Sequence, residues 1–192
     1  EQDGKWVDYD NTLEEVDADE SELNHKIAKN KDLMNRNADY KVRLSKKTNG
    51  KKFVRLEKDG YKILWYYANA DKSTAKIIEN EKDEDPTTLE NLSSAVLYED
   101  VYKKTDFEYI IGSDGLKENI ILNSKKSPCA FEAVYKANGL IPVQIDNKTI
   151  ELRSDDESVV YVITAPYMED ENGQASGNIT LTLTDVKNNT FT

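Results

Sequence analysis

Alternation of apolar and polar residues marks much of the chain and predicts β-strands. Residues 40–45 alternate in this way, and residues 53–56 are expected to form the return strand after the turn sequence Asn49-Gly50. A second turn sequence, Asp59-Gly60, leads into residues 61–67, where the odd-numbered positions carry three aromatic rings and an isoleucine. Since alternate residues of a strand point to opposite faces, we expect a three-stranded meander with one aromatic face.

The stretch from residue 93 to residue 122 has the clearest hairpin pattern. Residues 107–111 and 116–122 are rich in β-branched and aromatic side chains, and Gly112-Ser-Asp-Gly115 separates them. We expect the two glycines to supply the positive φ that a tight reversal requires.

Short apolar runs recur through the rest of the chain at the spacing of an all-β protein. The further predicted strands are residues 74–78, 131–136, 142–145, 149–153, 159–164 and 179–183. We expect an antiparallel β-sandwich with long acidic loops and at most one or two short helices. It is either a single sandwich domain over residues 1–192 or two closely packed half-sandwiches with a boundary near the charged segment 79–90.

Three segments near the loops allow other interpretations. Residues 6–13 mix aromatic and acidic side chains and are typical of an edge strand, since the calcium-loop spacing is absent. Between residues 14 and 38, Leu23, Ile27, Leu33 and Met34 favour a weak helix capped by Ser21, with a long surface loop as the alternative. Thr87 and Glu90 have capping-box spacing, which predicts one helical turn over residues 88–92.

The charge balance disfavours nucleic acid as a partner. Lysine and arginine number 26 against 37 acidic residues, so the formal net charge is −11, and such a surface repels phosphate backbones. Lys46, Lys47, Lys51 and Lys52 flank Asn49-Gly50 and are interpreted as a solvated turn. We expect no membrane span in this sequence, since no apolar stretch approaches about 20 residues.

The chain contains few residues for thiol or imidazole chemistry. Cys129 is the single cysteine, so no intrachain disulfide forms, and we expect it to be a small buried hydrophobic residue. His25 is the single histidine and lies in a polar segment. The pair is too sparse for a zinc site or a catalytic triad.

Carboxylate chemistry is the remaining catalytic hypothesis, because a glycosidase needs two carboxyl groups about 5–9 Å apart. The acidic residues that the predicted sheet brings near one another are Glu99, Asp100, Asp106, Glu108 and Glu118. We interpret Glu118 beside Lys117 as a cross-strand charge pair and Asp106 as a residue of the turn that begins its strand. The sequence therefore predicts no catalytic residues.

Two groups of residues are candidates for ligand binding. Trp65, Tyr66 and Tyr67 would stack on sugars if they faced solvent, although one aromatic face of a sheet usually packs in the core. Asp170 and Asn172 lie in an acidic loop ahead of Gly173 and are candidate calcium ligands, with a solvated hairpin turn as the alternative. We expect no cofactor other than calcium.

Several segments together resemble a known family. They are residues 97–102 (LYEDVY), 105–109 (TDFEY), 115–122 (GLKENIIL), 139–140, 146–150, 165–173 and, near the start, 4–13. The set is similar to the β-rich region that precedes a DNRLRE-type module in secreted or wall-associated RHS/YD-repeat proteins of Gram-positive bacteria. The resemblance omits about residues 14–38 and 69–86, and it carries no catalytic residues.

The resemblance implies a fragment of a larger exported protein, secreted or associated with the cell wall. Its expected role is non-catalytic, structural or adhesive, with downstream domains of the same chain and cell-wall or host glycans as partners. A carbohydrate-binding module with an aromatic strand is the alternative, and a carboxylate-dependent glycoside hydrolase is the third hypothesis.

Overall fold

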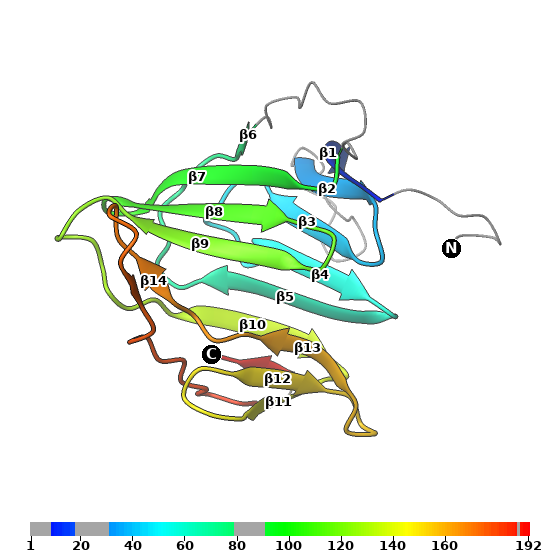
Figure 1. The fold of residues 1–192 in the computed structure, drawn as a ribbon. Helices are drawn as coiled ribbons and strands as arrows, with labels where there is room; N and C mark the ends of the chain where they lie inside the picture. Colours follow the sequence, from blue (N-terminus) through cyan, green and yellow to red (C-terminus); the bar gives the residue numbers. More distant parts are fainter. Residues whose placement is uncertain (1–8, 18–30, 79–90, 188) are drawn as a thin grey trace. The chain divides into compact units, whose positions relative to one another are not determined.

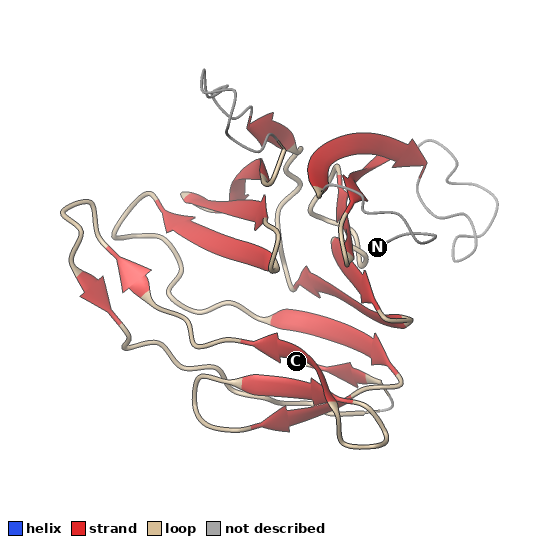
Figure 2. Cartoon of the chain, turned by 45° about the vertical axis from the view of Figure 1, so that its right-hand side comes forward, coloured by secondary structure: helices blue, strands red, loops and turns tan. Residues whose placement is uncertain are grey.

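A computed structural model describes residues 9–17, 31–78, 91–187 and 189–192. The described chain is all-β and sandwich-like, with antiparallel sheets and no helix, as the alternation predicts (Figure 2). It divides into two compact units, which are described separately below. Unit 1 comprises Glu1–Gly60 and Leu64–Ala133, and unit 2 comprises Tyr61–Ile63 and Val134–Thr192. The predicted boundary at residues 79–90 lies outside the described residues, and the described residues on both sides of it belong to unit 1.

The first sheet of unit 1 contains the predicted meander. Its strands, in sheet order, are β1 (Asp10–Asp17), β2 (Lys31–Asn37), β3 (Lys41–Ser45), β4 (Val54–Lys58) and β5 (Tyr61–Tyr67). Asp59 and Gly60 have φ values of 52° and 82°, which is the left-handed pair that a two-residue hairpin turn requires. β1 stands first in the sheet order, so the predicted edge strand is confirmed over residues 10–13, while residues 6–8 lie outside the described residues. Residues 14–17 extend this strand and correct the helix or loop predicted there.

The second sheet of unit 1 confirms the predicted hairpin. Its strands are β6 (Lys76–Ile78), β7 (Ser94–Tyr102), β8 (Thr105–Ile111) and β9 (Leu116–Leu122), and β7, β8 and β9 run antiparallel side by side (Figure 1). The backbone N–H of Gly112 donates to the Gly115 carbonyl at 2.9 Å and closes the turn. The predicted positive φ at these two glycines is wrong, because neither adopts it.

The hairpin turn is instead held from outside by a tyrosine. The Tyr40 hydroxyl lies 2.5 Å from the Gly112 carbonyl oxygen and 2.7 Å from the Gly115 carbonyl oxygen. Burial of this hydroxyl raises the pKa of Tyr40 to about 12, so the phenol stays protonated and remains a donor.

Facing aromatic rings fill the core between the two sheets of unit 1. The Phe53 ring meets the Tyr98 and Tyr109 rings edge to face, with centroids 4.9 and 5.5 Å apart, and Tyr67 meets Phe107 in the same way at 4.6 Å. Such pairs contribute about 0.5–1.5 kcal/mol each beyond their buried area. The predicted aromatic face of residues 61–67 is therefore confirmed as a core face at Trp65 and Tyr67, the two aromatic residues of this face that belong to unit 1.

The helix predicted around Leu33 and Met34 is wrong, because residues 31–37 form a strand. They form β2, which pairs with β1 on one side and β3 on the other, so tertiary pairing overrides the weak helical spacing. The Asn35 side chain completes the strand, because its Oδ1 accepts the Val42 N–H at 2.8 Å. Residues 21–30 and 88–90 of the predicted helices lie outside the described residues.

Unit 2 is a set of short strands over a small core. The strands are β10 (Ala133–Asn138), β11 (Ile141–Gln144), β12 (Ile150–Arg153), β13 (Val159–Ile163), β14 (Met168–Glu169), β15 (Ala175–Ser176) and β16 (Thr190–Phe191). Ile150 and Leu152 are buried, and Phe191 stacks flat on Tyr135 at 4.8 Å. The predicted hairpin at residues 142–153 is confirmed, with the Lys148 N–H donating to Asp146 Oδ1 at 2.7 Å.

The strand predicted over residues 179–183 is wrong. The segment is extended and every second residue is partly covered, but it enters no ladder. The Gln144 side chain takes the place of a neighbouring strand: its Oε1 accepts the Leu183 N–H at 2.9 Å, and its Nε2 donates to the Leu181 carbonyl at 2.7 Å. A side-chain amide thus satisfies backbone groups that a ladder would otherwise pair.

Candidate functional site

One buried carboxyl group stands out among the residues that carry chemistry. Glu118 on β9 faces the core of unit 1, where the Tyr67 hydroxyl donates to its Oε1 and the Tyr109 hydroxyl donates to its Oε2 at 2.5 Å. The Trp65 indole on β5 lies near the same carboxylate. We refer to Trp65, Tyr67, Tyr109 and Glu118 as the Glu118 cluster.

Strand register places the four residues together. Tyr109 and Glu118 are directly paired across β8 and β9, and Trp65 and Tyr67 share one face of β5 because they are two residues apart. Glu118 as a residue keeps some exposure at its backbone and stem, but its carboxyl group is enclosed. The cluster is therefore part of the packed interior of unit 1.

Enclosure sets the electrostatics of Glu118. Removal from water raises the pKa of this carboxyl above its usual value of 4.5, while hydrogen bonds from Tyr109 and Tyr67 and the nearby Trp65 indole act in the opposite direction. The desolvation effect is the larger one. The prediction that Glu118 forms a cross-strand charge pair beside Lys117 is wrong, because its contacts are with neutral phenols.

The other acidic residues of this sheet hold the framework together. Asp106 Oδ1 accepts the Asp100 N–H at 2.7 Å and its Oδ2 accepts the Asn123 amide at 2.7 Å, so Asp106 joins β8 to the segments that flank it. Glu108 accepts from the Asn119 amide at 2.6 Å, and Glu99 pairs with Lys76. Each of these carboxylates has a structural partner.

Glu108 and Glu118, two of the carboxyl groups considered for a glycosidase, point to opposite faces of the sheet. Glu108 is paired with Asn119, and Glu118 is paired with Tyr109 in the next row of the same ladder. Since adjacent residues of a strand face opposite sides, Glu118 points into the core and Glu108 away from it. This pair does not flank a common cleft.

The aromatic residues proposed for sugar stacking are mostly in the core. Trp65 and Tyr67 are each 7% exposed, and the Phe107 ring that contacts Tyr67 is fully buried in the core of unit 1. Tyr66 is half-buried and lies on the other face of β5. A flat solvent-facing platform requires exposed rings, and Trp65 and Tyr67 do not meet that condition.

The acidic loop proposed for calcium is organised as a hairpin turn. Asp170 Oδ1 accepts the N–H groups of Asn172 at 2.9 Å and of Gln174 at 3.0 Å, between β14 and β15. These hydrogen bonds lower the pKa of Asp170. In the described part of the chain, no group of three or more His, Cys, Asp or Glu side chains is arranged to hold a metal ion.

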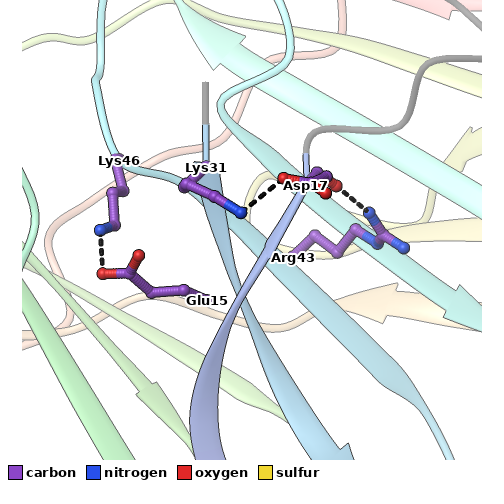
Figure 3. Close-up of polar contacts among 5 residues, drawn as sticks. All are labelled: Glu15, Asp17, Lys31, Arg43 and Lys46. Atoms are coloured by element: carbon purple, nitrogen blue, oxygen red, sulfur yellow. Dashed lines mark hydrogen bonds and ion pairs between the residues drawn. The ribbon is translucent and has the colours of Figure 1, made fainter. Parts of the chain in front are cut away.

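A row of charge pairs covers the first three strands of unit 1. Lys31 Nζ lies 2.5 Å from Asp17, Lys46 pairs with Glu15, and the Arg43 guanidinium donates to the Asp17 carbonyl oxygen at 3.4 Å (Figure 3). These side chains are largely exposed, so solvent screens their contacts and they add little to stability. One of the lysines predicted to form a solvated turn, Lys46, thus reaches an acidic residue of the edge strand.

Two further polar groups escaped the sequence interpretation. Asp32 and Arg55 form an ion pair whose side chains are 3% and 17% exposed. Asn11 and Asn35 are buried, and the Asn35 amide donates to Asn11 Oδ1 at 3.1 Å. Register was the missing signal, because strand propensity alone does not reveal which cross-strand partner encloses a polar residue.

Cys129 corrects another prediction. It is exposed in the loop between β9 and β10, whereas a small buried hydrophobic residue was expected. The loop carries lysines and serines at residues 124–127, and it has no apolar layer that would enclose the thiol.

Comparison of the chain with protein-family models, with curated proteins and with solved structures finds no match. The resemblance to secreted RHS/YD-repeat proteins therefore remains a prediction. Among the described residues, no helix has the length and apolar character needed to cross a membrane.

Proposed function

We propose that this chain is a non-catalytic structural or adhesive module of a secreted or cell-wall-associated bacterial protein. It would hold or space other parts of the same chain, with downstream domains as its first partners. The resemblance over residues 97–122 and 165–173 supports this setting.

The observation that carries the proposal is that the candidate catalytic carboxylates and the candidate sugar-binding rings Trp65 and Tyr67 make contacts within the fold. Asp106, Glu108 and Glu118 each hydrogen bond within the β-framework, and Trp65 and Tyr67 are core residues. A catalytic acid must reach a substrate within about 2.6–3.2 Å. Side chains enclosed by their own sheet are better suited to rigidity than to turnover.

A sedimentation and hydrolysis experiment tests the proposal. Purified protein is incubated with insoluble cell walls and with soluble cell-wall and host glycans, and both bound protein and released reducing ends are measured. We expect no release of reducing ends. Binding without release would identify the adhesive form of the proposal.

Matched variants make the outcome specific. Glu118→Gln removes the enclosed carboxylate, and Glu108→Gln removes its outward-facing neighbour. Glycan hydrolysis that either substitution abolishes would overturn the proposal in favour of a carboxylate glycosidase. Glycan binding that Tyr66→Ala abolishes would instead favour the carbohydrate-binding module.

A further inference from the structure

The Glu118 carboxyl group is enclosed by neutral donors. Tyr67 on β5 and Tyr109 on β8 each donate a hydroxyl to a separate oxygen, and the Trp65 indole on β5 faces the same group. Among the described residues, these three are the polar groups that act on the carboxylate, and none of the three is cationic. A buried carboxylate normally has a cation or a metal to offset the cost of its charge.

We propose that Glu118 is a proton-binding site built into unit 1, and that binding of this proton tightens the fold under mildly acidic conditions. The inference goes beyond the proposed function, and it holds whether or not the module binds a glycan. It assigns to the core of unit 1 a response to the acidity of its surroundings.

The geometry accommodates both protonation states. When Glu118 is ionised, each oxygen accepts one phenol hydroxyl, as observed. When it is protonated, the new O–H can donate to one phenol oxygen while the other phenol still donates to the carbonyl oxygen. Protonation therefore removes a buried charge and leaves both tyrosines with partners.

The direction of the effect follows from linkage. Burial raises the pKa of Glu118 in the folded protein above 4.5, the ordinary value that applies when the chain unfolds. Between these two pKa values the folded state holds more protons than the unfolded state. Stability from this group is thus complete below the ordinary pKa and is lost as pH rises through the folded pKa.

Other carboxyl groups respond in the opposite direction, so a single pH profile of the wild type is insufficient. The pKa values of Asp10, Asp156 and Asp170 are lowered in the folded state, chiefly by hydrogen bonds that outweigh desolvation in Asp10. Their contribution is lost as pH falls. The Glu118 effect must be isolated as a difference between variants.

The test compares the thermal midpoint of the wild type, Glu118→Gln and Glu108→Gln between about pH 4.5 and pH 8. Glutamine at position 118 can accept from one phenol and donate to the other, so it imitates the protonated state at every pH. We expect Glu118→Gln to unfold at a higher temperature than the wild type at the upper end of this range. The difference should shrink as pH falls, whereas Glu108→Gln should follow the wild type.

A second readout covers the case in which Glu118→Gln does not fold. The δ-carbon of Glu118 is followed by NMR in the wild type and in Tyr109→Phe. We expect wild-type Glu118 to titrate above the range of exposed glutamates, and Tyr109→Phe to titrate higher still, because a donor to the ionised form is gone. Parallel midpoint curves for the wild type and Glu118→Gln, or titration of Glu118 with the exposed glutamates, would overturn the proposal.

Discussion

At the scale of single residues, the buried polar groups are the most sensitive positions in unit 1. Asp32 is almost fully enclosed and its carboxylate pairs with Arg55, which crosses from β4. An ion pair of this kind adds little by itself, but removal of one partner leaves a charge in the core. We therefore expect substitutions at such positions to lower the stability of the fold.

We predict that Arg55→Ala lowers the free energy of unfolding by about 3–5 kcal/mol, because Asp32 keeps its charge without its guanidinium partner. Arg36→Ala is the matched control, since Arg36 pairs with Glu14 where both side chains are 48% exposed. Its expected cost is much smaller, because solvent screens an exposed ion pair. Urea unfolding measures both, and equal losses would contradict this account of Asp32.

The Tyr40 hydroxyl offers a second prediction at this scale. Tyr40→Phe removes the donor that holds the β8–β9 turn and should cost about 0.5–1.5 kcal/mol. The loss should be local, so amide hydrogen exchange is expected to accelerate at residues 112–116. Unchanged exchange in this turn would show that the hairpin holds without Tyr40.

At the scale of elements, turn residues and alternation located most strands of both units. The β8–β9 hairpin and the aromatic side of β5 follow from period-two patterns and from Gly-containing turns. Residues 179–183 alternate equally well but lack a strand partner, since Gln144 supplies their hydrogen bonds. Alternation predicts which side of a segment is buried, but it does not predict whether a strand or a side chain pairs with the segment.

The candidate site was only partly predictable for the same reason. Trp65 and Tyr67 were assigned to one face from their spacing alone, and the structure confirms that this face is the core. Glu118 was misinterpreted because Lys117 is its neighbour in sequence, whereas Tyr109 is its neighbour across the ladder. Register between strands carries that information, and a single sequence does not state it.

Two glycines in predicted turns give a matched prediction about elements. Gly60 has a φ of 82°, whereas Gly50 lies outside the left-handed region, and a Cβ at either position would meet no atom within 4 Å. Gly60→Ala should therefore destabilise the protein by about 1 kcal/mol or more through backbone strain. Gly50→Ala should be neutral or stabilise slightly, and equal midpoints in urea for the two variants would contradict the argument.

At the scale of the whole molecule, the carboxylates and aromatic rings named above make contacts that stabilise the fold. Asp106 ties loops to β8, Asp170 closes the β14–β15 turn, and the rings of unit 1 pack edge to face. The net charge of −11 adds a field that disfavours anionic polymers. These features agree with the proposed role of a structural module.

The thermal midpoint of the purified protein, measured across calcium, EDTA and a panel of cell-wall and host glycans, tests this account most directly. A ligand that binds the folded state raises the midpoint in proportion to the logarithm of its concentration once its site is saturated. The structural account predicts a midpoint that none of these additions moves. A rise with calcium that EDTA reverses would contradict it, and a concentration-dependent rise with one glycan would contradict the purely structural form and favour glycan binding.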